Sequence, residues 1–262
     1  MAATSSPSPS PSQQQLVTFV FGDSLTEVGN NNHLQYSLAR SDFPWYGVDF
    51  PGGQATGRFT NGRTIAQKLG TESPPPYLSL SKNDDALLKG VNYASGGAGI
   101  LNETGQYFRL YELGGRKVVF HGLGPLGCIP SQRVKSKKGQ CLNRVNEWVL
   151  EFNARVQKLI STLNGRFPGA KLMFADTYGD VLDLIEDPTS YGFKISNTSC
   201  CNVDTSVGGL CLPNSKMCNN RTDYVFWDAF HPSDAANQIL ADKFFSRLFP
   251  APSPAPAATL SP

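Results

Sequence analysis

Short apolar runs alternate with longer amphipathic segments along most of this chain, and that alternation limits its fold more than any other feature. Strands are predicted at residues 16–21, 90–94, 117–123 and 171–176. Apolar residues recur every three or four positions over residues 142–163, which predicts a long amphipathic helix between the last two strands. Strands that alternate with helices favour a parallel sheet covered on both faces, with functional loops at the carboxyl ends of the strands. The sequence therefore predicts an α/β fold.

Shorter helices are predicted around this framework. Asn61 is expected to cap a helix over residues 62–69, and Gly165 to end the long helix. Pro232 and Ser233 are expected to open the last helix of the chain.

Composition favours one folded domain, which we expect over residues 16–249. The chain has 262 residues, of which 40% are hydrophobic, enough for a substantial core. Residues 1–15 and 250–262 are rich in Ser, Pro and Ala and are expected to be disordered. A formal charge of +2 supplies no basic field, which argues against a nucleic-acid partner.

The cysteines indicate disulfides. There are six, at positions 128, 141, 200, 201, 211 and 218, and an even number suits an oxidising compartment. A bridge from Cys128 to Cys141 could close a loop, but the pairing is otherwise open. Zinc is the alternative, and it is disfavoured because no Cys-x-x-Cys occurs and no histidine lies among the cysteines. No metal is expected.

Other signals bear on location. Sequons at Asn102, Asn197 and Asn220 agree with an extracellular glycoprotein. Against this, residues 1–15 contain neither the basic nor the apolar region of a signal peptide. No apolar run is long enough for a transmembrane segment.

A candidate nucleophile follows the first strand. Residues 16–21 run into a Gly-Asp-Ser turn that presents Ser24, and a helix beginning there would favour an oxyanion beside it. Asp228 and His231, three residues apart, could supply the acid and base of a hydrolytic triad. Taken singly, each piece is also compatible with a structural turn or a half-buried polar side chain.

Longer motifs resemble the plant GDSL esterase/lipase family, part of the SGNH hydrolases. The resemblance extends over about residues 16–249, and its landmarks occur in order: FGDSL at 21–25, GNNN at 29–32, GRFTNGR at 57–63, GVNYASGGAG at 90–99, GLGPLGC at 122–128 and WDAFHP at 227–232.

That resemblance implies a flavodoxin-like parallel sheet and a serine esterase acting on a lipid or another acylated molecule. It makes Ser24 the nucleophile, His231 the base and Asp228 the residue that orients it. The backbone N–H groups of Ser24 and Gly96 would be oxyanion donors. No cofactor is implied, and a monomer is expected.

The family's third block, a Gly-x-Asn-Asp that supplies another oxyanion donor, has no match between Gly99 and Gly122. Roughly eighty residues look deleted, judged from the usual size of a βα pair, with the shortening near residues 105–112. Either the sheet closes up, which would separate Ser24 from His231, or strand edges stay open. We expect a four-stranded core, marginal stability and weak activity. A non-catalytic ligand-binding relative or an unstable variant is the alternative.

Overall fold

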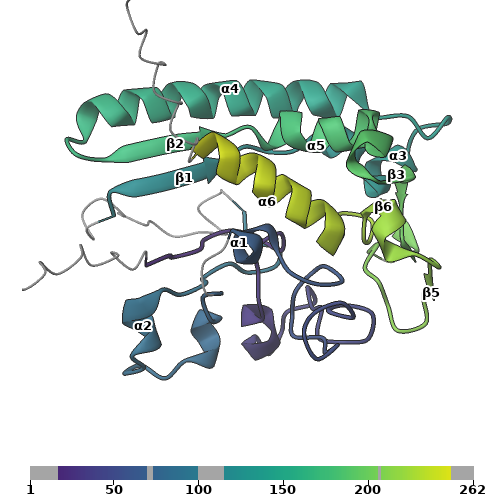
Figure 1. Cartoon of the computed structure of the whole chain (residues 1–262), viewed down its shortest axis with the longest axis horizontal. Coiled ribbons are helices and arrows are strands. Elements are labelled where there is room, and N and C mark those ends of the chain that lie inside the picture. Colours follow the sequence, from purple (N-terminus) through teal and green to yellow (C-terminus); the bar gives the residue numbers. More distant parts are fainter. Residues whose placement is uncertain (1–16, 70–72, 100–114, 206–207, 249–262) are drawn as a thin grey trace, which may run out of the picture.

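The computed structural model describes residues 17–69, 73–99, 115–205 and 208–248 (Figure 1). The expected disordered ends at 1–15 and 250–262 lie outside these residues. In chain order, the helices are α1 (Ile65–Lys68), α2 (Ala86–Lys89), α3 (Pro130–Arg133), α4 (Asn143–Arg166), α5 (Thr177–Glu186) and α6 (Asp234–Leu248). The strands are β1 (Lys117–His121), β2 (Lys171–Ala175), β3 (Ile195–Ser199), β4 (Cys201–Asn202), β5 (Lys216–Met217) and β6 (Tyr224–Phe226).

A parallel pair of strands lies between two layers of helix. β1 and β2 pair in register from Lys117 opposite Lys171 to His121 opposite Ala175. The long helix α4 runs along one side of this pair, and α6 crosses the other side (Figure 1). The ring of His121 stacks on that of Phe244 in α6, with their centroids 4.4 Å apart. Parallel strands flanked by helices confirm the predicted α/β class.

Helix α4 matches the predicted amphipathic segment closely, but it continues through Gly165 to Arg166. Two buried asparagines on this helix hold the loop that follows β1. Asn153 accepts from the N–H of Leu123 and donates to its carbonyl, each at 2.9 Å. Asn146 accepts from the N–H of Gly127 at 2.7 Å. The helix thereby fixes the loop as well as covering the strands.

The first two predicted strands form only a minimal pairing. The N–H of Val20 donates to the carbonyl of Val91 at 3.0 Å, and that of Tyr93 donates to the carbonyl of Val20 at 2.7 Å. The one bridge of this pairing joins Val20 to Asn92. Val17 and Phe19 are 44% and 46% exposed, so this segment lacks the cover expected of a central strand.

The four predicted strands therefore form two separate parallel pairs, and β3 and β6 form another. Among the described residues, β1 pairs with β2 alone, and no ladder joins it to the segment around Val20. The sequence predicted a continuous four-stranded core. In the described residues the sheet does not close up into one, and the strand edges remain open. The predicted shortening near residues 105–112 falls outside the described residues.

The cap of α1 also differs from the prediction. The helix begins at Ile65 after Thr64, whose N–H donates to the side chain of Gln67 at 3.2 Å. Asn61 accepts from the N–H of Asp234 at 2.8 Å and so serves the start of α6. Asn61 therefore bonds to Asp234, far away in the sequence, and not to the nearby start of α1.

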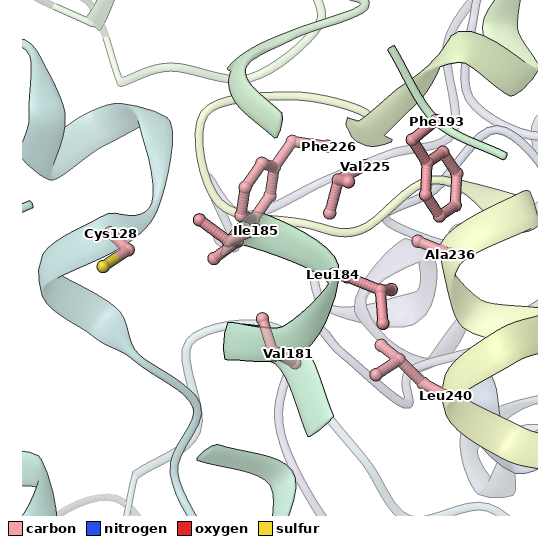
Figure 2. Packing of buried hydrophobic residues seen from close by; sticks show 9 residues of the cluster. All are labelled: Cys128, Val181, Leu184, Ile185, Phe193, Val225, Phe226, Ala236 and Leu240. Carbon is pink, nitrogen blue, oxygen red and sulfur yellow. The ribbon is translucent and has the colours of Figure 1, made fainter. Parts of the chain in front are cut away.

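The main apolar core lies between α5, β6 and α6 (Figure 2). Leu184 of α5 is fully buried there, with Phe226 and Leu240 in the same cluster. A second cluster surrounds Trp227 and Tyr46 and includes buried cysteines. Among the described residues, no helix is both long and apolar enough to cross a membrane.

Three disulfides confirm the reading of the cysteines. They join Cys128 to Cys141, Cys200 to Cys218 and Cys201 to Cys211. Because every cysteine is paired, none is available as a zinc ligand. The last two bridges close the loop that carries the antiparallel pair β4 and β5.

Replacing Leu184 by Ala should lower the free energy of unfolding by about 2 to 5 kcal/mol, because it removes buried methyl groups and leaves a cavity. Leu88→Ala is the matched control, since Leu88 is 80% exposed. The control should change stability by no more than about 0.5 kcal/mol. Urea unfolding measures both, and equal effects would contradict the assignment of this core.

Candidate active site

Ser24 lies half-buried in a single turn after the extended segment at Val20. The N–H groups of Thr26 and Glu27 both donate to the carbonyl of Asp23, at 3.2 and 3.1 Å. No helix continues beyond this turn, because Gly29 follows with a φ of 135° that right-handed helices exclude. A helix dipole at Ser24 is thus reduced to one turn.

Asp228 and His231 lie in a tight turn after β6. The N–H of Trp227 donates to the carbonyl of His231 at 2.8 Å and closes this turn. Asp228 Oδ1 accepts from the N–H groups of Phe230 and His231, each at 2.9 Å. Asp228 is fully buried and His231 is 5% exposed, so both side chains are held in fixed positions.

The structure brings these two side chains to Ser24. His231 Nε2 lies 2.8 Å from Ser24 Oγ. His231 Nδ1 lies 2.8 Å from Asp228 Oδ1 and 2.9 Å from Oδ2. Such an arrangement lets the imidazole take the serine proton while the carboxylate stabilises the resulting charge. The separation of Ser24 from His231 expected from a closed sheet is therefore not seen.

Gly96 lies beside the segment that follows Ser24, but its N–H already donates to a side chain there. That N–H donates to Glu27 Oε2 at 2.5 Å, and the N–H of Asn31 donates to Glu27 Oε1 at 2.6 Å. Desolvation raises the pKa of Glu27 to about 7, against the lowering effect of these backbone donors. In this structure, the expected oxyanion donor is directed at a buried carboxylate.

Little space surrounds this loop. A Cβ at Gly96 would come within 2.9 Å of Glu27, Asn31 and Phe59. Asn31 donates to the carbonyl of Gly96 at 2.9 Å and accepts from the hydroxyl of Ser95 at 2.5 Å. No role at the site was predicted for Glu27 or Asn31, although Asn31 belongs to the GNNN motif.

Tyr46 also belongs to the site, through a contact with Asp228 that was not predicted from the sequence. Its hydroxyl donates to Asp228 Oδ2 at 2.7 Å, and its side chain is almost completely buried. No sequence signal connects the two residues, which are separated by 182 positions.

The aromatic residues before Tyr46 line a hollow of about 500 Å³ that includes Phe43 and Trp45. A smaller hollow of about 310 Å³ is lined by polar residues that include Asp49 and Arg221. Neither is lined by Ser24 or His231.

All three histidines lie in the described part of the chain, and His231 alone hydrogen-bonds to Ser24. His33 is exposed at the end of a 3-10 turn over Asn30–His33, and His121 stacks on Phe244. Within the described residues, no group of three His, Cys, Asp or Glu side chains could hold a metal ion.

Comparison with known proteins identifies the family of this chain. The family model described as GDSL-like lipase/acylhydrolase matches residues 18–113 and 106–244. A GDSL esterase/lipase of Arabidopsis thaliana is 58% identical, over 94% of this chain and 93% of the relative. A second from the same plant is 34% identical over 92% of each chain.

The alignment with the first relative spans 330 positions, more than the 262 residues of this chain. With the matched landmarks in order around Ser24 and His231, the chain belongs to the GDSL family of lipases and acylhydrolases, which are carboxylic ester hydrolases.

Proposed function

We propose that this chain is a serine esterase that acts through an acyl-enzyme, with Ser24, His231 and Asp228 as its catalytic triad. The observation that carries the proposal is the continuous series of hydrogen bonds from Ser24 Oγ through the imidazole to the buried carboxylate. Family membership supports ester hydrolysis, and the series of bonds supports these three residues as the site.

In the proposed reaction, His231 Nε2 takes the proton of Ser24 as Oγ attacks the ester carbonyl. Asp228 stabilises the imidazolium, and the N–H of Ser24 donates to the oxyanion. The alcohol then leaves with the proton from Nε2. Water, deprotonated by the same imidazole, attacks the acyl-enzyme and releases the carboxylic acid.

The substrate class is an ester of a lipid, an acylated small molecule or an acylated polysaccharide, with no cofactor required. An extracellular location is part of the proposal, because three disulfides suit an oxidising compartment. A monomer is proposed as well. Glycosylation is proposed on the same basis. Asn197 is an exposed sequon position on β3.

Turnover should be low. The N–H of Gly96 donates to Glu27, and no Gly-x-Asn-Asp block is present to supply a further donor. Losing one oxyanion donor costs about 10² to 10³ in kcat. The alignment, which is longer than this chain, supports internal shortening as the origin of the missing block.

A non-catalytic ligand-binding relative is the second candidate, favoured by the occupied N–H of Gly96. A short-chain nitrophenyl ester and a fluorophosphonate probe separate the two. Hydrolysis with labelling of Ser24 supports the esterase. A folded protein that neither turns over the ester nor reacts with the probe supports the binding protein.

Ser24→Ala should abolish ester hydrolysis, because no other described hydroxyl hydrogen-bonds to His231. In a fully active enzyme the loss reaches about 10⁶ in kcat. Ser246→Ala is the control, since that hydroxyl is exposed on α6 and bonds only to a carbonyl of its own helix. Hydrolysis by Ser24→Ala at the parental rate would refute the assignment.

His231→Ala should also remove activity, whereas His33→Ala and His121→Ala should retain it. In the parent, kcat/KM should fall as the pH drops through the titration of the base, since only neutral imidazole accepts the serine proton. A pH profile of kcat/KM for the four proteins checks this. Loss of activity in either of the other two variants, with His231→Ala active, would reassign the base.

Turnover should lie far below that of the Arabidopsis thaliana relative at 58% identity, measured on the same ester. A chimera that carries the relative's internal segment in place of residues 100–114 should regain turnover, because it restores the missing block. Equal turnover by the unmodified chain, with cooperative unfolding, would show that this block is dispensable.

A further inference from the structure

We propose that Tyr46 is a positioning residue that orients the carboxylate of Asp228 and shares its negative charge. The proposal deepens the serine esterase function and rests on it. Tyr46 does not touch the reacting atoms. It acts through Asp228, and so through the orientation and basicity of His231.

The two oxygens of Asp228 are held differently. Oδ1 accepts two N–H groups from its own turn, those of Phe230 and His231. Oδ2 accepts from Tyr46 Oη at 2.7 Å, and its other contact is His231 Nδ1 at 2.9 Å. Tyr46 is thus the contact that holds the carboxylate from outside the turn.

The direction of the Tyr46 hydrogen bond follows from its neighbours. The N–H of Cys211 donates to Tyr46 Oη at 2.9 Å, so the phenol oxygen already acts as an acceptor there. A carboxylate can only accept. The phenol proton therefore lies between Oη and Asp228 Oδ2, where it lowers the negative charge on that oxygen.

The phenol is held firmly enough for this role. Cys211 is joined to Cys201, whose N–H donates to the carbonyl of Trp227, next to Asp228, at 2.9 Å. The Tyr46 ring makes T-shaped contacts with the rings of Phe43 and Phe59, whose centroids lie 5.4 and 6.0 Å from its own. Burial raises the pKa of Tyr46 well above its usual value, and the charge of Asp228 adds to this. The hydroxyl consequently stays protonated and able to donate.

Among the described residues, the titratable groups in contact with Asp228 are Tyr46 and His231. The buried carboxylate of Glu27 bonds to Gly96 and Asn31 and not to Asp228. Without the phenol proton, the full charge of the carboxylate would act on the imidazole. A carboxylate of greater charge favours the protonated imidazolium. His231 should then keep its proton to higher pH, and its ring should be less well oriented for Ser24.

The test compares the parent with Tyr46→Phe, which removes the hydroxyl and keeps the ring. Tyr224→Phe is the matched control, because Tyr224 packs against the same cluster and its hydroxyl has no hydrogen bond to Asp228 or His231. The readout is an NMR pH titration of the imidazole resonances. With three histidines in the chain, His33→Gln and His121→Gln assign them.

In Tyr46→Phe, the titration midpoint of His231 should move up by about half a pH unit or more, as expected when a hydrogen bond to a charged group is lost. The midpoints of His33 and His121 should stay fixed, as should all three midpoints in Tyr224→Phe. An unchanged His231 midpoint overturns the proposal. That result with a lowered Tm would mean that Tyr46 serves packing alone.

Kinetics give the second readout. Tyr46→Phe should lower kcat about tenfold, the scale of one hydrogen bond, with KM nearly unchanged. The acid limb of its pH profile should move up together with the NMR midpoint. A parent chain with no Ser24-dependent turnover would refute the esterase function. The NMR titration would still decide the role of Tyr46, because it needs no substrate.

Discussion

The proposed chemistry depends on one hydrogen bond between two distant parts of this chain. Ser24 Oγ and His231 Nε2 are 2.8 Å apart and 207 positions apart in the chain. Ser24 follows the segment that pairs with residues near Asn92, whereas His231 lies in a turn after β6. Keeping this contact requires that the two segments hold their relative positions, although no continuous sheet connects them in the described residues.

Hydrogen bonds from side chains to the backbone, more than strand pairing, hold the segment that carries Ser24. Glu27 bonds the N–H groups of Gly96 and Asn31, and Asn30 donates to the carbonyls of Asn92 and Ala94, each at 2.8 Å. A buried carboxylate is costly unless it is hydrogen-bonded, so these contacts depend on one another. The same network binds the N–H of Gly96, the proposed oxyanion donor. The contacts that stabilise the Ser24 segment are therefore also those expected to lower turnover.

The sequence predicted the elements and residues that a clear local pattern marks. The apolar period of α4 and the runs at β1 and β2 fixed those elements, and motifs pointed to Ser24, Asp228 and His231. It did not predict contacts between distant segments. Tyr46 lies in a stretch without apolar period, and its role depends on Asp228, 182 positions away. Asn61 was assigned to the wrong helix, because its partner is in α6.

The disulfides are unevenly distributed over the two sides of the site. All six cysteines lie within residues 128–218, and the bridged Cys201 donates its N–H to the carbonyl of Trp227, next to Asp228, whereas the segment that carries Ser24 has no disulfide. A reducing environment would therefore loosen the support of Asp228 and His231 before that of the Ser24 segment. The activity proposed for this site should thus require oxidised disulfides. On reduction, the position of His231, the proposed proton acceptor, should be lost before that of Ser24.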